Sequence, residues 1–204
     1  MHRTVGLLIA ALFAARAFAA APPRRLVFLG DSLTAGYMLA VERAYPYLLQ
    51  QRVAAAGLAW DVKNAGISGD TSAGALRRVE ALVKDPPGLL VVWIGANDGL
   101  RGQDIGAMNK NVDAILAAAQ AHRVPTMLVQ MKIPPNYGPD YTARFEAVYP
   151  ELAKKYGVPL IPFPMEAVAG EPDLNLADGV HPNAKGHALI ADALWKALEA
   201  RLRQ

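Results

Sequence analysis

A serine, a histidine and an aspartate stand in this sequence where they could carry out acyl transfer. Ser32 lies in "GDSLTAGY", and Asp178 precedes His181 by three residues in "LADGVHPNAKGH". A carboxylate this close can accept a hydrogen bond from the imidazole Nδ1–H, which leaves the other ring nitrogen free to act as a base. Each feature alone also has an ordinary explanation, because Asp and Ser cap helices and form turns.

Two further stretches could supply hydrogen-bond donors to a negatively charged intermediate. Gly69 lies in "NAGISGDTSAG", and Asn97 lies in "GANDGLRG". Glycine lets a backbone N–H approach a ligand closely, and an asparagine side chain carries an amide donor. Both stretches are also good turn sequences. A nucleophile, a base, an orienting carboxylate and oxyanion donors are nevertheless the complete set of parts that acyl transfer requires.

Short apolar runs alternate with longer helical patterns along the chain, which predicts an α/β fold with a five-stranded parallel sheet. The carboxyl ends of parallel strands lie along one edge, where ligands bind, and the four motifs follow the first, second, third and fifth predicted strands. The strands are expected at residues 25–29, 60–64, 89–94, 126–131 and 158–163. The helices are expected at residues 44–57, 71–85, 108–122, 141–157 (despite Pro150) and 184–202.

The first 19 residues have the pattern of a secretory signal peptide: a basic start, an apolar stretch, and small residues at Ala17–Ala19. An uncleaved anchor is the alternative, but Arg16 leaves the apolar stretch shorter than the roughly 20 residues that span a bilayer. We therefore expect an exported protein, periplasmic or secreted, with residues 20–204 forming one domain. The chain has no cysteine, which excludes a lipid-modified cysteine, disulfides and thiolate metal ligands.

The charge pattern gives no sign of a nucleic-acid partner. Without residues 1–19 the chain has 19 Lys and Arg against 18 Asp and Glu, so its net charge is about +1. Nucleic-acid binders usually carry a basic stripe, whereas the pairs Arg24–Arg25 and Arg77–Arg78 are isolated and read as solvent-exposed faces. We expect a small-molecule substrate, no stable membrane anchor and a monomer.

The four motifs resemble, in order and spacing, the conserved blocks of the SGNH or GDSL hydrolases, and the likeness extends over nearly the whole mature chain. The resemblance implies a flavodoxin-like, three-layer α/β/α sandwich and a serine hydrolase without metal or cofactor. It implies that Ser32 is the nucleophile, His181 the base and Asp178 its orienting partner. It also implies that the Ser32 N–H, the Gly69 N–H and the Asn97 side chain form the oxyanion hole.

The chain looks most similar to bacterial periplasmic enzymes with acyl-CoA thioesterase, arylesterase and lysophospholipase activity. This implies cleavage of carboxylic esters and thioesters of acyl chains. Ala96 stands where some relatives have glycine, which could alter the pocket floor. Apolar residues after the third and fourth strands could line an acyl groove, or could simply pack the loops. They are Leu100, Ile105, Met131, Ile133, Pro134, Pro135 and Tyr137.

Two other functions fit parts of the sequence. A carbohydrate O-acetyl esterase of the same superfamily would use the same catalytic parts, but would be expected to carry a more polar and aromatic platform. A non-catalytic flavin- or phosphate-binding module would use the Ser/Thr/Gly loop after the first strand to hold phosphate. The second alternative gives Asp178 and His181 no role, and Asp31 would repel an anion.

Overall fold

A five-stranded parallel sheet forms the centre of the computed structural model, which describes residues 22–204. The signal-peptide prediction for residues 1–19 lies outside the described residues. The strand order is β2-β1-β3-β4-β5, and all pairs are parallel, as the sequence predicts. The strands are β1 (Arg24–Gly30), β2 (Trp60–Gly66), β3 (Leu89–Trp93), β4 (Thr126–Val129) and β5 (Leu160–Ile161).

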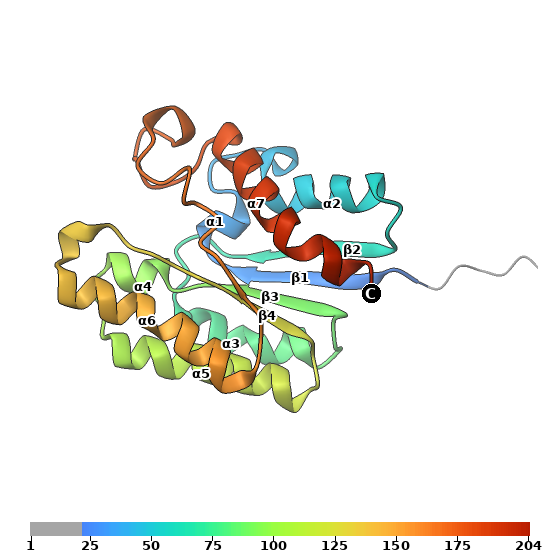
Figure 1. The fold of residues 1–204 in the computed structure, drawn as a ribbon, viewed down its shortest axis with the longest axis horizontal. Helices are drawn as coiled ribbons and strands as arrows, with labels where there is room; N and C mark the ends of the chain where they lie inside the picture. The colour runs from blue at the N-terminus through green and yellow to red at the C-terminus, as the bar shows by residue number, and fades with distance from the viewer. Residues whose placement is uncertain (1–21) are drawn as a thin grey trace, which may run out of the picture.

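Helices cover both faces of the sheet, which confirms the three-layer α/β/α sandwich. Two long helices lie on one face and three on the other (Figure 1). The first face carries α2 (Tyr45–Ala55) and α7 (Ala184–Leu202), and the second carries α3 (Ser72–Val83), α5 (Ile105–Ala121) and α6 (Pro139–Tyr156). Single-turn 3₁₀ segments occupy Val41–Arg43, Pro135–Tyr137 and Pro172–Leu174.

The core lies on both sides of the middle strands. All five residues of β3 are buried, as expected for a central strand with helices on each face. Aromatic side chains that include Phe28, Tyr45 and Trp93 fill the layer between the sheet and α2. At the end of the chain, the Trp60 indole N–H donates to the Leu202 carbonyl at 2.8 Å, which fastens the last turn of α7 to the edge strand β2.

The largest differences from the sequence predictions concern two short helices and the last strand. The short helices α1 (Ser32–Ala35) and α4 (Ala96–Leu100) are absent from the predicted elements, because four or five residues are too few to show a helical repeat. β5 has only two residues, since prolines at 159 and 162 lack the N–H that a longer ladder would use.

Pro150 lies inside α6 without ending the helix, as the sequence predicts. Proline has no N–H to donate to the carbonyl four residues earlier, which belongs to Glu146. That carbonyl instead accepts a hydrogen bond from the Gln130 side chain at 3.1 Å. This bond supplies the Glu146 carbonyl with a donor, so α6 can continue past Pro150. It also joins α6 to the loop that follows β4.

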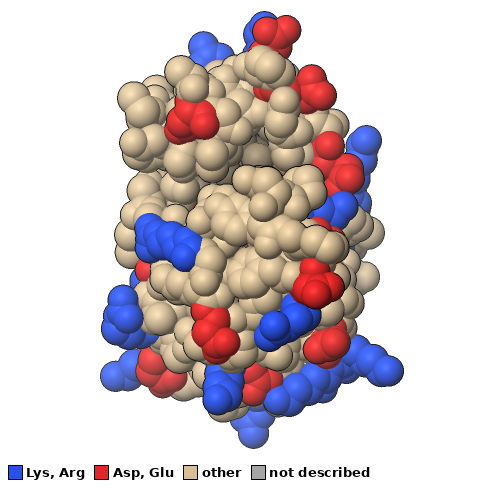
Figure 2. Space-filling model, turned by 90° about the vertical axis from the view of Figure 1, so that its left-hand side faces the viewer, with Lys and Arg blue, Asp and Glu red and all other residues tan. Residues whose placement is uncertain are grey.

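The sheet order places β1 between β2 and β3, so the connections leaving β1 and β3 diverge to opposite sides. Such a switch point leaves a crevice at the carboxyl ends of the strands, where α/β proteins bind ligands. Figure 2 shows this end of the molecule: charged side chains lie mainly at its margins, and its hollowed centre has few of them. Among residues 22–204, no helix has the length and apolar character needed to cross a membrane.

Candidate active site

The serine of "GDSLTAGY" is held where β1 turns into α1. Asp31 caps this helix, because its Oδ1 accepts the Leu33 N–H at 3.0 Å. Ser32 is therefore the first residue of α1, where the backbone N–H has no helical acceptor. Its hydroxyl lies 2.9 Å from Nε2 of His181, 149 residues further along the chain.

The histidine and its carboxylate share one short loop before α7. Asp178 Oδ2 lies 2.8 Å from His181 Nδ1, while Oδ1 accepts the backbone N–H groups of Val180 and His181, each at 2.9 Å. These bonds, above all the one from the His181 N–H, lower the pKa of Asp178 to about 2. The carboxylate therefore stays charged at neutral pH, and its 40% exposure to solvent favours the same charged form. A serine hydroxyl, imidazole and carboxylate in this chain of hydrogen bonds can deliver an activated alkoxide to a carbonyl carbon.

An aromatic contact that sequence reasoning missed supports the histidine ring. The Tyr37 ring packs against His181, with centroids 4.5 Å apart and planes tilted by 39°. Tyr37 is the last residue of the "GDSLTAGY" motif, so the same segment supplies both the hydroxyl and a wall for the imidazole. Only the closeness of Tyr37 to Ser32 in the sequence could have indicated this contact.

The two predicted oxyanion donors lie side by side. The Asn97 amide Nδ2 donates to the Asp70 carbonyl at 2.9 Å, which places α4 against the residue that follows Gly69. Arg101 completes the connection, since its Nη2 lies 3.1 Å from the Gly69 carbonyl and 3.3 Å from Asn97 Oδ1. Gly69 has φ +79°, a backbone conformation that favours glycine. Within residues 22–204, the Gly69 N–H and the second Asn97 amide hydrogen have no hydrogen-bond acceptor.

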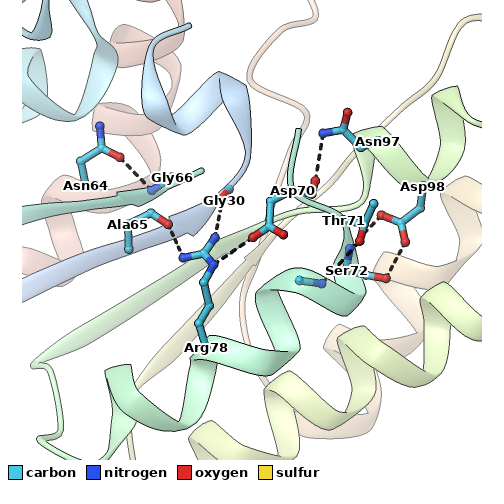
Figure 3. A network of polar contacts seen from close by, with 11 residues as sticks. Gly30, Asn64, Ala65, Gly66, Asp70, Thr71, Ser72, Arg78, Asn97 and Asp98 are labelled. Carbon is cyan, nitrogen blue, oxygen red and sulfur yellow. Dashed lines mark hydrogen bonds and ion pairs between the residues drawn. The ribbon is translucent and has the colours of Figure 1, made fainter. Parts of the chain in front are cut away.

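Polar contacts beneath these donors join the ends of four elements (Figure 3). The buried Asp98 carboxylate accepts the backbone N–H of Ser72 at 2.8 Å and its hydroxyl at 2.5 Å. Thr71 caps α3 through a 3.4 Å bond from the Gly74 N–H. These bonds join α4, which carries Asn97 and Asp98, to the start of α3.

The interpretation of Arg77–Arg78 as an exposed pair is wrong for its second member. Arg77 is exposed, but the Arg78 side chain is only 20% exposed and pairs with Asp70 at 2.9 Å. Helical geometry explains the difference, because adjacent residues on a helix point about 100° apart. Asp98, Asp70 and Arg78 are among the polar residues near the site that sequence reasoning did not assign to it.

A cavity of about 460 Å³ opens beside Ser32 and His181. Its lining is mostly apolar and includes the predicted Leu100, Ile133 and Pro134. Tyr137 and Ile105 are not among the residues that line it. The Tyr137 hydroxyl donates to the Leu100 carbonyl at 2.6 Å, and Ile105 is buried at the start of α5. The remaining lining residues are Leu33, Ala96, Asn97, Met131, Lys132, Pro135, Phe163, Met165, Glu166, Ala169, Gly170, Gly179 and Val180.

The cavity extends away from Ser32 along the sheet. Its walls come from the segments that follow β1, β3, β4 and β5, which are neighbours in that order. Lys132 and Glu166, from the last two segments, form a 2.8 Å ion pair in its wall.

Two other buried ionisable groups lie near the centre of the molecule. His187 accepts the Tyr45 N–H at 3.1 Å, and burial lowers its pKa to about 4, so it is a neutral structural histidine. Burial raises the pKa of Asp31 to about 7, and its Oδ2 has no hydrogen-bond partner among the described residues. In residues 22–204, no group of three or more His, Cys, Asp and Glu side chains is arranged to hold a metal ion.

Known proteins are similar to this one in sequence or fold over most of the chain. The model of the GDSL-like lipase/acylhydrolase family matches residues 28–189. Thioesterase 1/protease 1/lysophospholipase L1 of Escherichia coli strain K12 is 41% identical over 187 residues, which cover 89% of this chain and 86% of that protein. An arylesterase of Vibrio mimicus is 34% identical over 97% of this chain and its own full length.

A solved structure agrees with the sequence relatives. The psychrotrophic esterase EstA of a Pseudoalteromonas species, described as inhibited by monoethylphosphonate, superposes with a TM-score of 0.84 at 37% identity, covering 89% of this chain and 100% of its own. Phosphonates of this kind are tetrahedral at phosphorus, as the intermediate of acyl transfer is at carbon. The chain belongs to the GDSL-like lipase/acylhydrolase family, a family of serine hydrolases.

Proposed function

We propose that Ser32, His181 and Asp178 are the catalytic triad of a hydrolase that cleaves carboxylic esters and thioesters of acyl chains. The hydrogen-bonded series from Asp178 through His181 to Ser32, with separations of 2.8 and 2.9 Å, carries this proposal. The relatives named thioesterase, lysophospholipase and arylesterase give the same reaction class.

The reaction has two halves. His181 takes the Ser32 proton as the hydroxyl oxygen attacks the carbonyl carbon, and the tetrahedral oxyanion accepts hydrogen bonds from the Ser32 N–H, the Gly69 N–H and the Asn97 amide. The C–O or C–S bond then breaks as His181 protonates the leaving alcohol or thiol, which leaves an acyl group on Ser32. Water, deprotonated by His181, attacks this acyl-enzyme and releases the acid. Asp178 stabilises the imidazolium in both halves.

The apolar cavity supports an acyl chain as the recognised part of the substrate. Its lining is dominated by aliphatic side chains, proline and one phenylalanine, and its volume of about 460 Å³ leaves room for more than an acetyl group. The Ala96 methyl forms part of this surface, where a glycine would leave more room.

The test is a set of p-nitrophenyl esters of increasing chain length, run beside acyl-CoA thioesters and lysophospholipids. We expect activity to rise beyond acetyl and to disappear in Ser32→Ala. An optimum at acetyl would favour a carbohydrate O-acetyl esterase. Near-normal activity in Ser32→Ala would rule out the nucleophile assignment altogether.

We also propose that the protein is exported and matures by loss of residues 1–19. The support is the sequence pattern at the N-terminus, and N-terminal sequencing of protein made from the full-length gene in a Gram-negative host is the test. A mature chain that still begins at Met1 would contradict it. We further propose that the mature enzyme is a monomer of residues 20–204, to be checked by size-exclusion chromatography with light scattering.

A further inference from the structure

One arginine joins the strand before the proposed nucleophile to the loop that carries an oxyanion donor. Arg78 of α3 donates from Nε to Asp70 Oδ2 at 2.9 Å, from Nη1 to the Ala65 carbonyl at 2.5 Å, and from Nη2 to the Gly30 carbonyl at 2.8 Å (Figure 3). A planar guanidinium holds its donors in a fixed fork, so it can satisfy three separate acceptors at once.

The acceptors lie beside the proposed oxyanion donors. Gly30 ends β1, two residues before Ser32. Asp70 directly follows Gly69, and its backbone carbonyl accepts the Asn97 amide at 2.9 Å. Asp70 therefore binds Arg78 through its side chain and Asn97 through its backbone. The segments that carry the Ser32 N–H, the Gly69 N–H and the Asn97 amide are therefore connected through Arg78 and Asp70.

The pair is tightly enclosed. The side chains of Arg78 and Asp70 are only 20% and 11% exposed. A Cβ at Gly74, one turn before Arg78 on α3, would lie 1.5 Å from Asp70 Oδ1. The carboxylate thus packs against bare backbone, and neither member can shift without disturbing α3. Removing one member of a shielded ion pair leaves the other without its partner, which costs far more than breaking a surface pair.

We propose that Arg78, with Asp70, is a positioning residue that holds the Ser32 N–H, the Gly69 N–H and the Asn97 amide at the separation the oxyanion needs. Arg78 does not line the cavity and so acts through these groups, not on the substrate. The inference rests on the proposed function, because it assumes that these three groups bind the oxyanion. Oxyanion donors must lie about 2.7–3.1 Å from the charged oxygen, so small displacements weaken them.

The test compares kcat and KM of Arg78→Met with those of Arg77→Met on a p-nitrophenyl ester. Arg77 is the matched control: it is the adjacent residue on α3, it is exposed, and it makes no side-chain hydrogen bond within residues 22–204. We expect Arg78→Met to lower kcat by about 10–100-fold with KM changed less than about 3-fold, because the donors act mainly in the transition state. Arg77→Met should match the wild type.

A double-mutant cycle separates positioning from a general structural role. If Arg78 works through the donors, Arg78→Met should lower kcat much less in an Asn97→Ala background, by about 3-fold. Titration with a phosphonate ester counts folded, reactive enzyme in each sample. Equal fold-losses of kcat in both backgrounds, or no loss in either, would overturn the inference.

Asp70→Asn provides a second route should Arg78→Met fail to fold. It keeps the side-chain shape and the backbone carbonyl that binds Asn97, but removes the charge that Arg78 faces. A fall in kcat supports positioning, and wild-type kcat refutes it. Activity surviving in Ser32→Ala would instead remove the proposed function, whereas inactive Ser32→Ala with fully active Arg78→Met would remove only the present inference.

Discussion

The two halves of the site are built in different ways. Asp178 and His181 belong to one exposed loop and are bound to each other across three residues. The oxyanion side is assembled from distant segments, with Asp98 reaching Ser72 across 26 residues and Arg78 reaching Gly30 across 48. The first half is local and partly solvent-exposed, and the second is long-range and largely buried.

This contrast teaches which residues can be lost without loss of the fold. Asp178 and His181 are not part of the buried core, so their removal should affect chemistry more than stability. The oxyanion side also holds α3, α4 and the sheet together, so its removal should affect chemistry and stability together. The following experiments test this division.

The largest effect is expected at the base. His181→Ala removes the proton acceptor, and kcat should fall by about 10⁴-fold or more. The melting temperature should fall by only a few degrees, because the ring contacts Ser32, Asp178 and Tyr37 but is not part of the buried core. Steady-state kinetics and differential scanning calorimetry on the same sample measure both values. A large fall in melting temperature would break the comparison.

The next effect is expected at the amide donor. Asn97→Ala removes one of three proposed oxyanion donors, so kcat should fall by about 10²–10³-fold with a small change in KM. Because the Asn97 amide also bonds to the Asp70 carbonyl, the melting temperature should fall as well. Kinetics and calorimetry on Asn97→Ala and His181→Ala, run side by side, show whether Asn97 contributes to both catalysis and stability. An unchanged kcat in Asn97→Ala would exclude the donor role.

The third prediction is that two aspartates contribute unequally to the free energy of unfolding. Asp98→Ala leaves the buried Ser72 N–H and hydroxyl without their acceptor, and should lower the free energy of unfolding by about 2–4 kcal/mol. Asp178→Ala affects a partly exposed carboxylate and should lower it by less than about 1 kcal/mol, despite a severe loss of activity. Urea denaturation of the two variants decides, and equal losses of stability would contradict the division.

The smallest effect concerns the pH dependence of stability. The pKa of Asp31 is raised by burial from 3.8 to about 7, so the folded protein keeps a proton that the unfolded chain releases above about pH 4. The contribution of Asp31 to the free energy of unfolding therefore falls as the pH rises from about 4 to 7. Asp31→Asn removes the titration and should add about 1–2 kcal/mol at pH 8, with little gain at pH 4. Urea denaturation at both pH values checks it, and equal gains would show that Asp31 does not titrate in this range.

Much of the local half could be predicted from the sequence. The last helix was expected at residues 184–202 and has those bounds, because Asn183 caps it and its apolar repeat is long. The Asp178 and His181 contact follows from three-residue spacing in one loop. The meeting of Ser32 with His181 follows from parallel strands sharing one edge.

The buried half could not be predicted in the same way. Arg78 stands next to an exposed arginine in the sequence, and nothing local marks it as the one that bonds to Gly30 and Asp70. Long-range contacts depend on how helices pack on the sheet, which local sequence patterns do not reveal. The same holds for Tyr137, because its side chain could face the cavity or the Leu100 carbonyl with equal local plausibility.

The bond between Trp60 and the Leu202 carbonyl has a practical consequence for handling the enzyme. α7 begins three residues after His181 and runs for 19 residues, about 28 Å, to the opposite end of the molecule (Figure 1). An affinity tag or resin linker fused after Gln204 would thus leave the catalytic mouth pointing outward into solution. Because the last turn of α7 is bonded to Trp60, the enzyme should keep this orientation when it is attached to a solid support.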